Sequence, residues 1–275
     1  MKNIVVKTVG SYINVLGYIS KQYAAGKALK LFTKPRKGKI TEEQASFLNT
    51  AFTEEFSYKD TPIMTYRWPG HKETILLAHG WESNSSRWQY LICDLKQKGY
   101  TIVALDAPGH GNSGNTYFNA LLYAEFIHVV SKRFSPEIII AHSVGGMAAT
   151  VFQKKYQIKS VQKLILLGAP SEFKDIISRY VDLLGYNNRV SNQLNITIEK
   201  RFGTKPEQFS TAKLLKDITT KGLIIHDKQD PVIPYEDALL IQDEFKNSTL
   251  ITTEGLGHSL KDNSIIEHIN QFLEA

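Results

Sequence analysis

A serine stands at a corner of the chain where a reactive side chain could be held. In PEIIIAHSVGGMAATVF (136–152), an apolar run typical of a buried strand meets Ser143 and then a helix-forming stretch. So sharp a turn forces its central residue to a positive φ, and the small Ala141 and Gly145 let strand and helix approach. The string A-H-S-V-G is a variant of the nucleophile elbow G-x-S-x-G. It favours a serine nucleophile at a helix N-terminus; a small-residue turn with a solvated serine is the alternative.

A nucleophilic serine needs a base, because the hydroxyl group is a weak nucleophile at neutral pH. His258, in EGLGHSL, follows the last predicted strand, and the glycines before it leave the backbone free to bring the imidazole to Ser143. His142 is adjacent to the serine and cannot fold back onto it. The other histidines lie in predicted turns, a loop or helices: His71, His79, His110, His128, His226 and His268. We therefore predict His258 as the base, with a polar loop residue as the alternative.

The base in turn needs a carboxylate to orient it, and HDKQDPVIP (226–234) offers two. We choose Asp230, because it begins the turn closed by Pro231 and Pro234. Asp227, directly after the predicted strand, could compete, and an Asp-Pro turn without a catalytic role is common. The order serine, acid, histidine, each after a separate strand, favours the chemical interpretation.

Strands and helices alternate along the part of the chain that carries these residues. Six apolar strings predict strands: TILLAHG (74–80), YTIVALDAPG (100–109), EIIIAHS (137–143), VQKLILLGAP (161–170), KGLIIHD (221–227) and STLITTEG (248–255). Helices fit at about 85–98, 119–134, 145–157, 235–246 and 260–273, and residues 55–70 suggest two antiparallel edge strands. The pattern predicts an α/β fold, a mainly parallel twisted sheet with helices on both faces. Ligands of such sheets bind at the carboxyl ends of the strands, where the three residues lie.

Five strings in this order resemble the α/β-hydrolase superfamily over about residues 55–275: LLAHGWESNSSRW, LDAPGHGNS, AHSVGG, HDKQDPVIP and GLGHSL. The resemblance implies a serine hydrolase with Ser143 as nucleophile, His258 as general base and acid, and Asp230 as its orienting group. It also implies an oxyanion hole made of the backbone N–H groups of Trp81 and Val144.

The sequence departs from the family pattern at three positions. Ala141 replaces a glycine, Asp227 stands where a glycine is frequent, and Asp106 belongs to a loop motif outside the triad. Epoxide hydrolases and haloalkane dehalogenases of this fold carry an aspartate at the elbow, so Ser143 argues against both.

The segment at about 171–215 is too long for an ordinary loop and predicts a small helical cap. Its apolar residues recur at helical spacing and either pack the cap or line a pocket: Phe173, Ile176, Ile177, Tyr180, Leu183 and Leu184. We predict His142, Trp81, Phe173 and Tyr180 as substrate-binding residues, with Trp88 and Phe118 as further apolar wall. The predicted substrate is a small, moderately apolar carboxylic ester or thioester. A peptidase or amidase, a perhydrolase, a lyase or a non-catalytic binding protein of this fold are the alternatives.

Composition narrows the remaining classes. The chain has 275 residues and one cysteine, Cys93, which excludes an internal disulfide and fits a reducing compartment, so we expect a cytoplasmic protein. The apolar stretches are shorter than a bilayer requires. The histidines lack zinc-ligand spacing and a glycine-rich phosphate loop is missing, so we expect neither metal nor cofactor.

The positive charge belongs to an N-terminal arm, predicted as residues 1–54 ahead of a hydrolase domain at 55–275. Residues 1–40 carry nine basic residues and no acid, which leaves −3 of the net charge of +6 for the rest. Because no basic stripe crosses the body, we expect no nucleic-acid partner.

Residues 3–30 predict one amphipathic helix, and the basic linker KPRKGK (34–39) follows it. Its apolar stripe comprises Val5, Val9, Tyr12, Leu16, Ile19 and Tyr23. A secretory signal is disfavoured, because polar residues interrupt the apolar core it needs. A helix in weak contact with an anionic membrane surface is the alternative. We favour a helix docked on the hydrolase body, because six apolar side chains are rarely left exposed.

Overall fold

The computed structural model describes residues 2–275, which divide into two compact units. The sheet unit comprises Pro35–Ser171 and Thr211–Ala275, and the helical unit comprises the chain up to Lys34 together with Glu172–Ser210. All five strings of the α/β-hydrolase resemblance lie in the sheet unit. No helix in the described part of the chain is long and apolar enough to cross a membrane.

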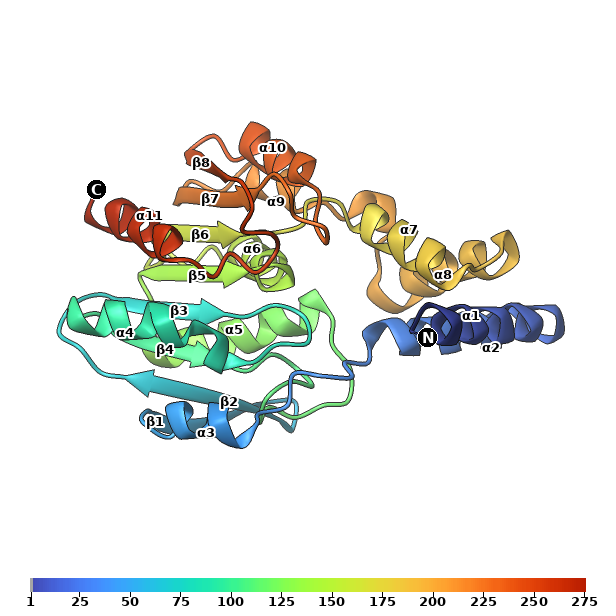
Figure 1. Ribbon diagram of the computed structural model, residues 1–275, viewed down its shortest axis with the longest axis horizontal. Coiled ribbons are helices and arrows are strands. Elements are labelled where there is room, and N and C mark those ends of the chain that lie inside the picture. Colours follow the sequence, from blue (N-terminus) through green and yellow to red (C-terminus); the bar gives the residue numbers. More distant parts are fainter. Residues whose placement is uncertain (1) are drawn as a thin grey trace. The chain divides into compact units, whose positions relative to one another are not determined.

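The sheet unit is built on a mostly parallel eight-stranded sheet in the order β1-β2-β4-β3-β5-β6-β7-β8 (Figure 1). Only the pairs β1–β2 and β2–β4 are antiparallel. The strands are β1 (Phe52–Tyr58), β2 (Thr61–Trp68), β3 (Thr74–Ala78), β4 (Thr101–Leu105), β5 (Ile138–His142), β6 (Lys163–Leu167), β7 (Lys221–Asp227) and β8 (Ser248–Thr253). This is the predicted α/β fold.

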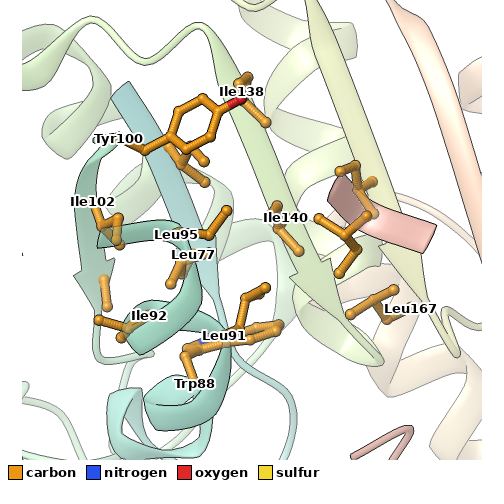
Figure 2. Close-up of a cluster of buried hydrophobic side chains, with 14 of the residues drawn as sticks. Leu77, Trp88, Leu91, Ile92, Leu95, Tyr100, Ile102, Ile138, Ile140 and Leu167 are labelled. Carbon is orange, nitrogen blue, oxygen red and sulfur yellow. The ribbon is translucent and has the colours of Figure 1, made fainter. Parts of the chain in front are cut away.

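Helices cover both faces of this sheet because the strands bury side chains on both. In β3, Ile75 and Leu77 belong to a core shared with α4 (Gln89–Gln97) and α11 (Asn263–Glu274), whereas Leu76 points to the other face and is buried there too. Figure 2 shows side chains of α4 gathered with those of the strands. The remaining helices of the unit are α3 (Glu42–Leu48), α5 (Ala120–Phe134), α6 (Val144–Tyr156), α9 (Thr211–Leu215) and α10 (Tyr235–Glu244).

The helical unit holds α1 (Lys2–Ile19), α2 (Lys21–Thr33), α7 (Phe173–Leu184) and α8 (Asn188–Phe202). The single helix expected at residues 3–30 is therefore two. The break is at Ser20, whose backbone is extended and whose side chain accepts a hydrogen bond from the N–H of Tyr23, capping α2.

The inward face of α1 is not the predicted stripe. Val9 and Leu16 do pack against the core of the helical unit, but the α1 residue buried in that core is Ile13. Val5, Tyr12 and Ile19 are exposed. Gly10 explains which side of α1 faces inward. A Cβ on Gly10 would lie 1.6 Å from the carbonyl oxygen of Leu184 in α7, so α1 can approach α7 this closely only with a glycine at the contact.

The division of the chain also differs from the expected one. The helices α1 and α2 share their core with α7 and α8 of the expected cap, not with the sheet unit. Residues 35–54 instead belong to the sheet unit, where Leu48 of α3 is buried in the core. Spacing alone shows that a helix has an apolar side but not which partner covers it.

Candidate active site

Ser143 occupies the sharp turn between β5 and α6. Its φ is 55° and its ψ is −129°, a strained combination for a residue with a side chain, and the residue is 5% exposed. A Cβ on Gly145 would lie 2.5 Å from the carbonyl oxygen of Ala78, so the turn requires glycine there. The serine thus lies at the carboxyl end of a central strand and at the N-terminus of a helix.

His258 and Asp230 complete a hydrogen-bonded row with this serine. The Nε2 atom of His258 lies 3.0 Å from the Oγ of Ser143, and its Nδ1 lies 2.7 Å from the Oδ2 of Asp230. Since a carboxylate can only accept, Nδ1 carries the proton, and the free Nε2 of the neutral ring accepts from the serine hydroxyl. The structure brings together the three residues that the sequence selects.

Asp230 is held in its ionised form. Burial alone would raise the pKa of this carboxyl group, but hydrogen bonds from His226, from His258 and from the backbone N–H groups of Ile233 and Val232 outweigh it and hold the pKa well below its usual range. His226 is fully buried; its Nε2 donates to the carbonyl oxygen of Ile233 at 2.9 Å and lies 3.4 Å from Asp230.

Asp227, the competing acid, faces elsewhere. Its Oδ2 accepts from the hydroxyl group of Thr253 at 2.8 Å and from the N–H of Leu256 at 2.9 Å, and its Oδ1 accepts from the N–H of Gln229. Asp227 therefore fastens the start of the loop that carries His258, here called the histidine loop (Glu254–Leu260), and leaves the imidazole to Asp230.

Two more side chains hold the histidine loop. The Nε2–H of His142 donates to the carbonyl oxygen of His258 at 2.8 Å, and Arg87 donates to that of Ser259 at 3.0 Å. His142 is 6% exposed, and burial, together with the nearby charge of Arg87, holds its pKa well below the usual range. The Nε2–H of His142 is therefore already bonded to the backbone of His258. Contact of His142 with substrate stays a prediction.

Both N–H groups predicted for the oxyanion hole come from segments beside the nucleophile. Val144 follows Ser143 directly, and a Cβ on Gly80, the residue before Trp81, would lie 2.9 Å from the Cβ of Ser143. Among the hydrogen bonds of the described residues, neither N–H is given to a protein acceptor. These donors are therefore available to an oxygen atom next to Ser143.

A buried polar network supports the Trp81 segment. His79 accepts from the N–H of Ala107 at 2.9 Å and lies 2.8 Å from the carbonyl oxygen of Gly80, and burial holds its pKa well below the usual range. Asp106 accepts from both the N–H and the hydroxyl group of Ser85. Sequence reasoning did not find these roles, although both residues lie in the strings that carry the family resemblance.

The four predicted substrate-binding residues fall in different units. The half-buried ring of Trp81 packs edge-on against His110 and Phe118, at 5.5 and 5.4 Å between centroids. Phe173 and Tyr180 belong to the helical unit, where Phe173 contacts Phe32 and Phe209 and the hydroxyl group of Tyr180 donates to the carbonyl oxygen of Ala28. Their contact with substrate stays a prediction. Within residues 2–275, no group of three or more His, Cys, Asp or Glu residues is arranged to hold a metal ion.

Comparison with known proteins gives concordant matches. The family model described as serine aminopeptidase, S33, matches residues 69–208, and the model of a TAP-like protein matches residues 194–275. A curated relative, the AB hydrolase superfamily protein YisY of Bacillus subtilis (strain 168), is 24% identical over 230 residues, which cover 69% of this chain and 86% of the relative.

A second relative and a solved structure point the same way. The bifunctional esterase/perhydrolase DCH of Acinetobacter calcoaceticus is 24% identical over 240 residues, 70% of this chain and 87% of the relative. The solved structure of Est1E from Butyrivibrio proteoclasticus with bound ferulic acid has a TM-score of 0.67 and 17% identity, covering 80% of this chain and 97% of that one. At that identity the structural likeness concerns the fold.

Proposed function

The chain belongs to the α/β-hydrolase superfamily, and we propose that it is a serine hydrolase that cleaves small, moderately apolar carboxylic esters or thioesters through an acyl-enzyme on Ser143. Relatives named as esterases and serine hydrolases support the hydrolase activity. The observation that carries the proposal is the row from Ser143 Oγ through His258 to Asp230, with separations of 3.0 and 2.7 Å.

In the proposed first step, the Oγ of Ser143 attacks the substrate carbonyl while the Nε2 of His258 takes the hydroxyl proton. Asp230 keeps the proton of the neutral ring on Nδ1, so that Nε2 is free to act as base, and then stabilises the imidazolium. The imidazolium returns its proton to the leaving alcohol or thiol, and the acyl group remains as an ester of Ser143.

In the second step water attacks the acyl-enzyme by the same route. His258 takes a proton from water, the tetrahedral intermediate collapses, and the proton returns to Ser143 Oγ as the carboxylic acid leaves. In both steps the negative oxygen would lie between the N–H groups of Trp81 and Val144, donors fixed by the backbone before the charge develops.

The apolar surroundings of Trp81 support the proposed substrate class. Its ring packs against Phe118, which is buried, and neither ring brings a formal charge to the site. The structure of a thioesterase domain from a curacin biosynthetic pathway shares the fold, with a TM-score of 0.60 at 17% identity. The apolar rings and the thioesterase likeness support a substrate with an acyl group. The substrate panel described below tests the leaving group and the length of the acyl chain.

A perhydrolase is the second candidate, because one relative is named a bifunctional esterase/perhydrolase. Hydrogen peroxide would replace water as the nucleophile that attacks the acyl-enzyme, giving a peracid in place of the acid. Assaying acetate plus peroxide beside ester hydrolysis separates the two, since both reactions require Ser143 but only one product oxidises a halide reporter.

The experiment that tests the proposal is labelling with a fluorophosphonate, which reacts with activated serines. We expect the wild-type protein to be labelled and Ser143→Ala to remain unlabelled with an unchanged melting temperature, because the hydroxyl group is needed only for the chemistry. Ser131→Ala, which removes a buried hydroxyl group in α5, is the matched control and should be labelled like wild type.

A substrate panel follows for the labelled protein, with acyl chains of increasing length on nitrophenyl esters, thioesters and aminoacyl amides. We expect esters or thioesters of short acids to be preferred. An unlabelled wild type, or a Ser143→Ala variant that still turns over substrate, contradicts the proposal. Preference for the amides would move the enzyme to the peptidase class.

A further inference from the structure

The outer side of α1 is a continuous apolar face. Six of its side chains are exposed by 61–81%, although all are large and apolar: Ile4, Val5, Tyr12, Val15, Tyr18 and Ile19. Their spacing places them on one side of the helix, with Thr8 and Ser11 among them. We call this surface the α1 face. Contiguous exposed apolar surface of this kind marks an interaction site.

The opposite side of α1 is fixed to the helical unit. Ile13 is buried in the core of that unit, Asn14 donates to the carbonyl oxygen of Gly185, and Gly10 is in close contact with the backbone of Leu184. Turning α1 over would expose Ile13 and break these contacts. A partner can therefore contact only the exposed side of α1, because the other side is packed against the helical unit.

The charge of the helical unit indicates the kind of partner. Residues 1–34 and 172–210 carry twelve lysine and arginine residues against five acids, a net charge of +7, so that the rest of the chain carries −1. On α2, which follows α1 after Ser20, the exposed side includes Lys21, Lys27 and Lys30. An apolar helical face beside cations is the combination that binds the surface of an anionic bilayer.

A basic pocket borders the C-terminal end of the α1 face. It has a volume of about 280 Å³ and is lined by Lys21, Asn188, Arg189, Asn192, Gln193 and Ile196. The guanidinium of Arg189 lies 5.9 Å from the centre of the Tyr18 ring, and its Nε donates to the carbonyl oxygen of Gly17 at 2.7 Å. A fixed arginine, a lysine and side-chain amides together suit a phosphate group.

We propose that the α1 face docks on the surface of an anionic phospholipid bilayer, with its apolar side chains at the level of the acyl chains and a lipid phosphate in the Lys21–Arg189 pocket. Tyr12 and Tyr18 suit this depth, since the ring of a tyrosine is apolar and its hydroxyl group reaches the wet headgroup layer. The surface is independent of Ser143, His258 and Asp230.

Sedimentation of the full chain with vesicles tests the docking. One set of vesicles is phosphatidylcholine alone, and in the other about a third of the lipid is phosphatidylglycerol. We expect binding to the anionic vesicles, reduced by salt, and little binding to the neutral ones. Substituting Tyr12→Ser, Val15→Ser and Ile19→Ser together should lower partitioning about tenfold or more, because serine matches these residues in helix propensity but removes the apolar surface.

Two further variants make the result specific. Lys21→Gln with Lys27→Gln should also weaken binding about tenfold at low salt and make it less sensitive to salt than wild-type binding. Tyr90→Ser, Leu239→Ser and Leu240→Ser together, which remove one tyrosine and two aliphatic side chains exposed in the sheet unit, should bind like wild type. Fluorophosphonate labelling in every variant reports the site separately, so failure of docking and failure of the hydrolase proposal are distinguishable.

Absence of binding to the anionic vesicles overturns the proposal, as does equal binding by the α1-face variant. If the full chain instead forms a dimer that the α1-face substitutions dissociate, while vesicles leave it in solution, the face is an interface between copies of this chain and the membrane proposal is wrong.

Discussion

Two aspartates three positions apart accept hydrogen bonds from different groups, and this difference predicts different mutant phenotypes. Asp230 accepts from the imidazole of His258, whereas Asp227 accepts from the backbone of the histidine loop and from Thr253. In Asp230→Asn the side-chain amide can favour the wrong tautomer of His258, so we expect kcat to fall about a thousandfold or more with little change in fold.

Asp227→Asn should show the reverse balance. An amide NH₂ in place of one carboxylate oxygen would face the N–H of Leu256 if it replaces Oδ2, or that of Gln229 if it replaces Oδ1. Two donors would then face each other at a buried side chain, which costs about 1–3 kcal/mol of stability. We expect a clearly lower melting temperature and a smaller loss of kcat than in Asp230→Asn. Equal losses of kcat, or the opposite ranking, would assign the orienting carboxylate to Asp227.

The lowered pKa of Asp230 predicts how stability depends on pH. Folding holds its pKa below the unfolded value of about 3.9, so the ionised carboxylate contributes stability that is present above that value and is lost as the pH falls through the folded pKa. In urea titrations, the difference in unfolding free energy between wild type and Asp230→Asn should narrow as the pH falls below about 4. A difference that stays constant into acid would mean that folding leaves the pKa of Asp230 unshifted.

The sequence identifies the proposed catalytic residues better than it identifies the side chains that hold them in place. Ser143, Asp230 and His258 could be selected because each chemistry requires a residue type at a known kind of loop. The contact of His142 with the carbonyl oxygen of His258 could not be, since it joins two loops that meet only in the folded sheet. The contact of His226 with Asp230 is local, four residues along one turn, but nothing in the residue types marks it. A histidine in a turn looks the same in sequence whether it touches substrate or supports a neighbour.

At the scale of elements, Gly10 determines how α1 packs, and this can be tested with a matched glycine. A Cβ at residue 10 would lie 1.6 Å from the carbonyl oxygen of Leu184, whereas a Cβ at Gly26 in α2 would meet no atom within 4 Å. Gly10→Ala should therefore lower stability by about 1–3 kcal/mol because α1 and α7 must separate. Gly26→Ala should raise it by up to about 1 kcal/mol through helix propensity.

Thermal melts followed by far-UV circular dichroism measure both variants. If both alanine substitutions raise the melting temperature, helix propensity rather than the close approach governs α1, and the inward face assigned to it is wrong.

The strands were predictable and the N-terminal helices only in part, for a physical reason. A strand buried on both faces must be apolar at nearly every position, which leaves an unambiguous run such as that of β5. α1 is apolar on two sides, so spacing supports more than one stripe, and the choice between them depends on the backbone of α7 against Gly10. The short helix α3, with no apolar repeat of its own, was not predicted at all.

At the scale of the whole molecule, each unit buries apolar side chains of its own. Leu77 belongs to a core of the sheet unit that includes side chains of α4 and α11, Leu194 belongs to the core of the helical unit, and both leucines are fully buried. The chain passes between the units near Lys34, Ser171 and Ser210. Ser143, Asp230 and His258 all lie in the sheet unit, so we expect the proposed chemistry to depend on the folding of that unit.

This division predicts two unfolding transitions in calorimetry of the full chain, because each unit buries its own apolar side chains. Leu194→Ala should lower the transition of the helical unit and Leu77→Ala that of the sheet unit, each by the about 2–5 kcal/mol typical of a leucine removed from a core. Fluorophosphonate labelling of Ser143, measured at rising temperature, should be lost with the transition that Leu77→Ala shifts and should be unmoved by Leu194→Ala. A single transition that both substitutions lower equally would show that the two cores unfold as one cooperative structure, and the active site would then depend on the helical unit as much as on the sheet.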